Sequence, residues 1–135
     1  MSELTVVRQL KAAPERVWRA WTSPDELAAW IWPPSWGASC TIDLRVGGRF
    51  AIASTGAGPG VSGEYVAIDP GERLVTTWQW DDEDVETLVT ITLEPSGEGT
   101  TLTITHERFT DEETRANHEQ GWNDCLDRLP GYLAG

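Results

Sequence analysis

The chain has 135 residues, of which 22 are acidic and 10 are basic, so its formal net charge is −12. This length is that of one domain, 1–135, and a chain of this size buries roughly two-thirds of the surface that its unfolded form exposes. The negative charge repels phosphate backbones and anionic membrane surfaces, which argues against nucleic-acid binding and membrane association.

The amino-terminal segment lacks the profile of a signal peptide, and no run approaches the roughly 20 apolar residues that span a membrane. Cys40 and Cys125 are far apart and form no CxxC motif. This spacing is typical of reduced, buried thiols in an intracellular protein, although a disulfide between them stays possible. The sequence predicts a soluble, cytoplasmic protein without a cofactor.

The first third of the chain is predicted to be one strand followed by two short helices. Apolar residues alternate over 3–10, and Pro14 suits the first position of a helix. Ser23 and Glu26 have the spacing of a capping box, which predicts the start of a second helix that ends before a proline-rich loop at 33–39.

Residues 40–106 alternate between apolar and polar side chains, which predicts several strands. Turn signals at Gly47-Gly48 and Asp69-Pro70-Gly71 indicate short connections, so the sheet is expected to be antiparallel. The acidic stretch 81–86 is expected to be a solvated hairpin end.

The last strand places His106 inward by parity, with Arg108 on the same side one step further out. Thr110 and Glu113 form a second possible capping box, which predicts the start of a long final helix. The helix carries an apolar stripe at Trp122, Leu126, Leu129 and Leu133. Pro130-Gly131 is expected to kink or fray its last turn.

Together these elements predict an α+β fold. A curved antiparallel sheet of about six or seven strands carries two short helices after its first strand, and the long carboxy-terminal helix lies across its concave face. A single helix cannot cover both faces of such a sheet, so its convex face is expected to be wet.

Four segments, at 13–30, 43–50, 63–78 and 106–129, resemble in this order the START-like (SRPBCC) superfamily with its helix-grip fold. Within it, the chain is similar to the family named after the carboxy-terminal domain of the activator of heat-shock protein 90 ATPase. The resemblance implies a hydrophobic cavity between sheet and helix. It also marks a departure, because the family often has glycine where this chain has Arg108.

The candidate ligand-binding residues are those that the pattern places near such a cavity: Trp32, Trp36, Phe50, Tyr65, Trp78, Trp80, His106, Arg108, His118, Trp122 and Leu126. The tryptophans either fill the core or leave a slot for a flat, apolar ligand. Trp32 and Trp36 would form a lid or simply anchor a loop, and the facing of Tyr65 is open because Val66 and Ile68 compete for the core side.

The two histidines allow several interpretations. His106 is either a hydrogen-bonded structural residue, the more frequent case, or a polar contact or general base for a ligand. His106 and His118 lack an evident third ligand, so no metal site is predicted. Glu64 and Glu107 have outward parity, which argues against a paired-carboxylate site.

Three functions are compatible with these patterns. The favoured one is binding of a small hydrophobic or aromatic molecule without turnover. The second is a cavity enzyme of the polyketide cyclase or dehydratase type, with His106 as proton carrier and Arg108 or Tyr65 polarising a carbonyl. The third is a chaperone-associated interaction module, whose acidic surface meets a basic partner. The chain is expected to be a monomer or a homodimer.

Overall fold

The computed structural model describes residues 2–56 and 59–134. Its elements follow the predicted order of a strand, two short helices, six strands and a long helix, with one extra 3-10 turn. They are β1 (Ser2–Leu10), α1 (Pro14–Thr22), α2 (Pro24–Trp30), η1 (Pro34–Trp36), β2 (Ala38–Ile42), β3 (Arg49–Ser54), β4 (Val61–Asp69), β5 (Arg73–Trp80), β6 (Thr87–Ser96), β7 (Gly99–Phe109) and α3 (Glu112–Ala134).

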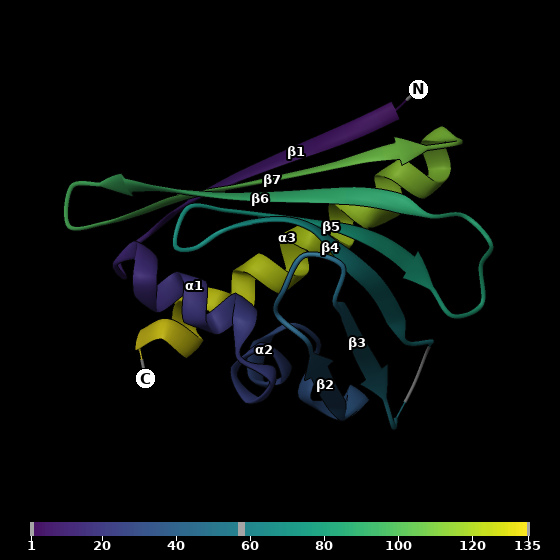
Figure 1. Ribbon diagram of the computed structural model, residues 1–135, viewed down its shortest axis with the longest axis horizontal. Coiled ribbons are helices and arrows are strands. Elements are labelled where there is room, and N and C mark those ends of the chain that lie inside the picture. The colour runs from purple at the N-terminus through teal and green to yellow at the C-terminus, as the bar shows by residue number, and fades with distance from the viewer. Residues whose placement is uncertain (1, 57–58, 135) are drawn as a thin grey trace.

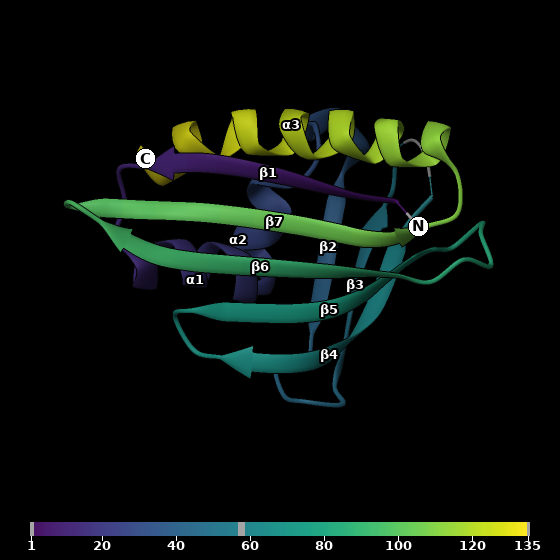
Figure 2. The ribbon, with the colours of Figure 1, turned by 90° about the horizontal axis from the view of Figure 1, so that it is seen from above.

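The strands form one seven-stranded sheet in the order β1-β7-β6-β5-β4-β3-β2, and every pairing is antiparallel. The sheet bends so strongly that β2 and β3 lie across the direction of β6 and β7 (Figures 1 and 2). Helix α3 lies on the concave side, and α1 and α2 close one end of it (Figure 1). This arrangement confirms the predicted α+β helix-grip architecture.

The core lies between the concave face of the sheet and the helices. Alternate residues of β7, such as Leu102, Ile104 and His106, are fully buried, and they face the buried stripe Trp122, Leu126 and Leu129 of α3. Burying an aliphatic or aromatic side chain of this size contributes about 1.5–3 kcal/mol, so this contact stabilises the packing of α3 against the sheet.

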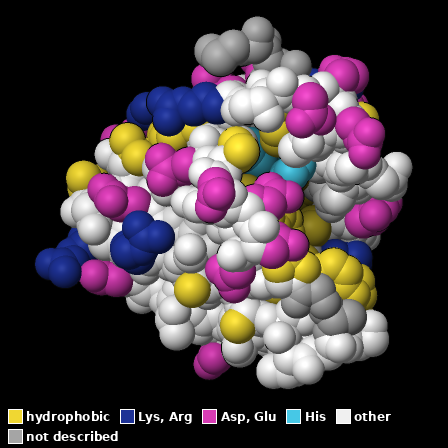
Figure 3. All heavy atoms as spheres, turned by 90° about the vertical axis from the view of Figure 1, so that its right-hand side faces the viewer, with side chains coloured by type: hydrophobic (Ala, Val, Ile, Leu, Met, Phe, Trp, Pro, Cys, Tyr) yellow, Lys and Arg dark blue, Asp and Glu magenta, His cyan; other side chains and the backbone are white. Residues whose placement is uncertain are grey.

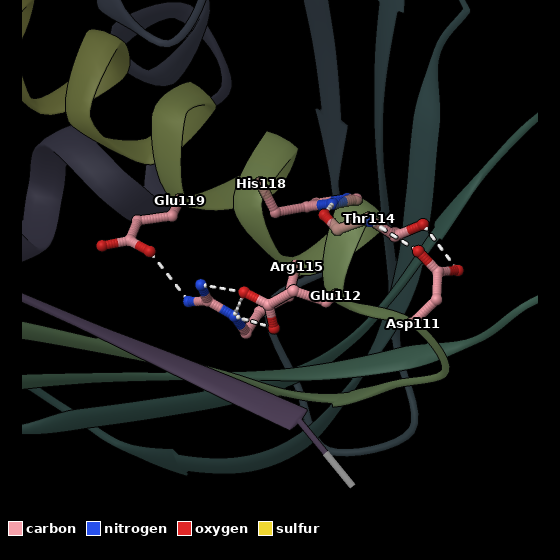
Figure 4. Close-up of polar contacts among 6 residues, drawn as sticks. All are labelled: Asp111, Glu112, Thr114, Arg115, His118 and Glu119. Atoms are coloured by element: carbon pink, nitrogen blue, oxygen red, sulfur yellow. Dashed lines mark hydrogen bonds and ion pairs between the residues drawn. The ribbon is translucent and has the colours of Figure 1, made fainter.

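Helix α3 begins one residue later than the sequence suggests, because Asp111 rather than Thr110 caps it. The backbone N–H of Thr114 donates to Oδ1 of Asp111 over 2.7 Å, and the Thr114 hydroxyl donates to Oδ2 (Figure 4). A carboxylate at this position satisfies a free N–H and complements the positive end of the helix dipole, an advantage that a threonine hydroxyl lacks.

The predicted capping box at the start of α2 is also wrong. Ser23 makes no side-chain capping bond there. The Glu26 carboxylate instead accepts hydrogen bonds from Arg16 over 2.6 Å, from Arg19 over 2.9 Å and from the Tyr132 hydroxyl over 2.9 Å. The backbone N–H of Ser23, which a capping box would direct to Glu26, donates to the Arg19 carbonyl over 2.9 Å and is therefore already satisfied.

The end of α3 does not fray at Pro130, since the helix continues to Ala134. Tertiary contacts hold this last turn in place. Tyr132 is tied to Glu26, and the Arg16 guanidinium lies 5.2 Å from the centre of its ring. These contacts offset the hydrogen bond that the proline removes.

No helix in the described ranges is long and apolar enough to cross a membrane.

Candidate functional site

The space directly between the sheet and α3 is filled by four tryptophans, which we call the inner cluster: Trp21, Trp30, Trp78 and Trp122. The rings of Trp21 and Trp30 lie 4.8 Å apart, and those of Trp78 and Trp122 lie 5.1 Å apart. A void of only about 30 Å³ remains among them, and Phe50 and Tyr65 line it. Side chains therefore fill most of the space in which the resemblance implied a cavity.

A groove of about 690 Å³ opens beside this filled interior instead. One side is the segment from Ile31 to Trp36, together with the end of β5. The other side is α3, from Thr114 to Arg128. Figure 3 shows a hollow on this end of the molecule, where apolar and histidine side chains are visible between acidic ones.

Three tryptophans, Trp32, Trp36 and Trp80, line one side of the groove, and we call them the groove wall. The rings of Trp32 and Trp36 lie 5.3 Å apart, and those of Trp32 and Trp80 are stacked at 6.1 Å with 14° between their planes. The lining that α3 contributes includes two small residues, Gly121 and Cys125, beside larger ones such as His118 and Trp122.

Two indole–imidazole hydrogen bonds connect the tryptophans to the histidines. The Trp80 indole N–H donates to Nε2 of His118 over 2.8 Å, and the Trp122 indole N–H donates to Nδ1 of His106 over 3.0 Å. Each accepting nitrogen must lack a proton, so the remaining nitrogen carries it. Nδ1 of His118 thus donates to the Thr114 carbonyl, and Nε2 of His106 donates to the Thr87 hydroxyl.

His106 is a structural residue in this network. It is fully buried, and both ring nitrogens are occupied by the hydrogen bonds above. Burial, with a smaller effect from His118, lowers its pKa to about 3, so the ring is neutral at physiological pH. His106 does not line the groove. The geometry therefore gives no support to His106 as a proton carrier.

The segment that begins at Ile31 and forms one side of the groove is connected to α3 by a set of hydrogen bonds, which we call the carbonyl clamp. The Arg128 guanidinium donates to the carbonyls of Trp30 over 3.0 Å and Ile31 over 2.8 Å, and the Cys125 thiol donates to the Ile31 carbonyl over 2.8 Å. These bonds satisfy carbonyls at the end of α2 that have no partner within the helix. Burial raises the pKa of Cys125 to about 12, so this thiol remains protonated and is a poor nucleophile.

The groove continues past Trp80 and His118 into a smaller pocket of about 250 Å³, lined also by Thr87 and Phe109. Trp78 lines the groove, the smaller pocket and the buried void. Its indole nitrogen is buried and has no hydrogen-bond partner in the described part of the chain. An N–H group of this kind costs about 1–3 kcal/mol if it stays unsatisfied.

The structure distributes the predicted site residues, Arg108 apart, over three places. Trp32, Trp36, Trp78, Trp80, His118 and Trp122 line the groove. Phe50 and Tyr65 line only the small void, Tyr65 being inward and Val66 exposed. His106 and Leu126 are completely buried behind the groove.

Arg108 is the predicted site residue that lines neither the groove nor the buried void. It is exposed, with a φ of 78°. The register between β1 and β7 shifts here, so Arg108 is the extra residue of a β-bulge and Phe109, not Arg108, points into the core. Alternation alone predicts that Arg108 points inward. This is wrong, because Arg108 itself is the extra residue of the bulge and the inward position passes to Phe109.

Sequence reasoning missed the residues that border the groove without belonging to an apolar pattern, notably Gly121, Asp124, Cys125 and Arg128 on α3. Gly121, Cys125 and Arg128 follow the predicted site residue His118 at helical spacing, which could have indicated them. Cys40 and Cys125 are both free, and Cys40 is only partly buried. In the described ranges, no three His, Cys, Asp or Glu residues are grouped so that they could hold a metal ion.

A family model described as activator of Hsp90 ATPase homolog 1-like protein matches residues 11–134. No curated protein matches the chain.

Several solved structures share the fold. Protein CV1439 from Chromobacterium violaceum is 31% identical, with a TM-score of 0.82 and coverage of 98% of this chain and 97% of that one. CalU16 from Micromonospora echinospora is 27% identical, with a TM-score of 0.77 and coverage of 97% and 75%. DynU16, described as a protein in the dynemicin biosynthetic locus, is 25% identical with a TM-score of 0.84, and the match covers 99% of this chain but 48% of DynU16.

Proposed function

Because the chain belongs to the activator of Hsp90 ATPase homolog 1-like family and has the helix-grip fold of the START-like superfamily, we propose that it binds a small, apolar and at least partly aromatic molecule. The binding site is the groove beside α3. The observation that carries this proposal is the combination of the groove's volume, about 690 Å³, with the three indole rings of the groove wall. Sites for small molecules typically enclose about 300–1,000 Å³ and have mainly apolar walls with a few polar groups.

The groove wall supports an aromatic ligand in particular. Trp32 and Trp80 are nearly parallel, and a flat ring system packs well against such faces. His118 holds the Trp80 ring in its orientation through a hydrogen bond to the indole nitrogen. The wall is thus prepared before a ligand arrives, which lowers the entropic cost of binding.

Trp78 borders the groove and has an indole N–H that no described residue satisfies. Its buried N–H has no acceptor among the described residues, and its ring borders both the groove and the smaller pocket. A ligand oxygen that reached this N–H would remove the cost of leaving it unsatisfied. The origin of DynU16 in a biosynthetic locus also supports a small-molecule ligand.

Gly121 gives a test that leaves the core intact. A side chain at Gly121 would meet no atom within 4 Å of its Cβ, and the position borders the groove. We expect Gly121→Phe to fold and to fill the groove, so that binding of Nile red, a neutral polycyclic dye, falls about tenfold or more. The measurement is a titration that follows the blue shift of the dye's emission.

Gly131→Phe is the matched control, because Gly131 lies on the same helix, has the same open surroundings and does not border the groove. It should bind Nile red as tightly as the native protein. Equal binding by the Gly121→Phe variant, or no binding by the native protein, would contradict the proposal.

A further inference from the structure

We propose that the molecule held in the groove carries a positive charge close to its aromatic part, an inference that rests on the proposed function. Four acidic side chains, which we call the acidic rim, border the groove together with the aromatic rings of the groove wall. Asp82 and Glu83 come from the loop between β5 and β6, and Asp124 and Asp127 come from α3.

The protein balances the charges of this acidic rim only in part. Arg128 is the one lysine or arginine among the described residues that border the groove, and its guanidinium is engaged by the carbonyls of Trp30 and Ile31. Both ring nitrogens of His118 are engaged, one by the Trp80 indole and the other by the Thr114 carbonyl. The groove therefore has an excess of negative charge.

Asp82 and Glu83 are the rim carboxylates best placed to meet a ligand. Asp127 lies 3.6 Å from Arg8, and Asp124 accepts a hydrogen bond from Gln120. Asp82 and Glu83 form no ion pair with any described residue, and both side chains are exposed. A cation at the mouth of the groove would be attracted to these carboxylates while it remained partly hydrated, so the desolvation cost stays small.

The aromatic rings behind the rim favour the same charge. The faces of indole rings attract ammonium groups through the ring quadrupole, and tryptophan is the best residue for this contact. The groove wall and the acidic rim thus select the same chemistry, an ammonium or amidinium group attached to a flat hydrophobic body. A ligand anion would be repelled by the rim and by the net charge of −12.

Three anthracene derivatives with the same ring system test the charge alone. 9-(Aminomethyl)anthracene is a cation at neutral pH, 9-anthracenemethanol is neutral, and 9-anthracenecarboxylate is an anion. We expect the amine to bind about tenfold more tightly than the alcohol and the carboxylate to bind most weakly, as measured by ligand fluorescence. Raising the salt concentration from about 50 mM to about 500 mM should reduce the advantage of the amine.

Two matched double variants locate the attraction. Asp82→Asn with Glu83→Gln should weaken binding of the amine about fivefold and leave binding of the alcohol unchanged. Glu94→Gln with Glu98→Gln changes the net charge equally at the hairpin between β6 and β7, which lies at the opposite end of the sheet (Figure 1). This control should change binding of the amine by less than about twofold.

Equal binding of amine and alcohol to the native protein would overturn the inference about charge and leave the proposed function standing. An equal loss of amine binding in the two double variants would also overturn the inference about charge, because the attraction would then come from the net charge of the whole protein and not from the rim. If none of the three derivatives bound, both proposals would fall.

Discussion

The inner cluster and the groove wall are built from the same residue type, yet one is closed and the other is open. In the inner cluster each indole meets another ring from a different element, as Trp78 of β5 meets Trp122 of α3 at 5.1 Å. In the groove wall Trp32 contacts the rings of Trp36 and Trp80, yet a groove of about 690 Å³ stays open beside them, and its lining on α3 includes the small residues Gly121 and Cys125. The number of tryptophans therefore does not by itself decide where the fold leaves space.

Replacing one tryptophan from each region tests this comparison with the largest expected difference in stability. Trp122→Ala should destabilise the protein by about 3–5 kcal/mol, because it opens a cavity and leaves Nδ1 of His106 without its donor. Trp36→Ala removes a half-buried ring from the groove and should cost less than about 2 kcal/mol. Chemical denaturation of both variants measures the difference.

If Trp122→Ala fails to fold, Trp122→Phe gives the same comparison at smaller amplitude. It keeps a ring in the interior and loses the indole N–H, with an expected cost of about 1–3 kcal/mol. Equal losses for Trp36→Ala and the Trp122 variants would contradict the division into a filled interior and an open groove.

The pH dependence of stability tests the filled interior at His106, the buried histidine that contacts Trp122 of the inner cluster. His106 is neutral in the folded protein because its pKa is lowered to about 3, whereas in the unfolded chain it takes up a proton near its ordinary value of 6.5. The unfolded state therefore binds more protons between these two values. Stability from this residue is complete above pH 6.5 and falls by about 1.4 kcal/mol per pH unit as the pH drops toward 3.

Denaturation between about pH 6.5 and pH 5 should show a loss of about 2 kcal/mol in the native protein, above the range in which most carboxylates titrate. His106→Gln keeps hydrogen-bonding groups but does not titrate, so its curve should be flatter over this interval. An unchanged slope in this variant would show that another group causes the loss.

The smallest expected effect concerns Arg108, whose φ of 78° is unfavourable for a residue with a Cβ. Arg108→Gly should stabilise the protein by about 1 kcal/mol, since glycine adopts this conformation without steric cost and the exposed arginine packs into neither region. Thermal unfolding measures the gain. A loss of stability would mean that the arginine side chain makes a contribution larger than the backbone strain.

Much of the fold is predictable because it depends on local patterns. Alternation of apolar residues along β7 and the apolar stripe on α3 indicate both elements and the side of each that is buried. The failures occur where a distant residue competes with a local one. Glu26 is drawn to Arg16 and Tyr132, and Asp111 displaces Thr110 as the cap of α3.

The candidate site is less predictable than the fold. Parity identifies the inward side of a strand, but it does not reveal whether the space beyond is filled, and a bulge at Arg108 reverses it altogether. The groove is formed by residues that are distant in the sequence. Trp36 and Gly121 both line it, although most of the chain lies between them. Only their spatial pairing makes the opening visible.

The carbonyl clamp has a kinetic consequence for any occupant of the groove. It ties α3 to the end of α2 through bonds from Arg128 and Cys125, and bonds to a charged donor contribute about 1.5–3 kcal/mol each. Separating the two walls at this end would be slow. A ligand of the proposed site would therefore enter and leave at the other end, between the β5–β6 loop and the first turns of α3, without a hinge motion of the clamped end.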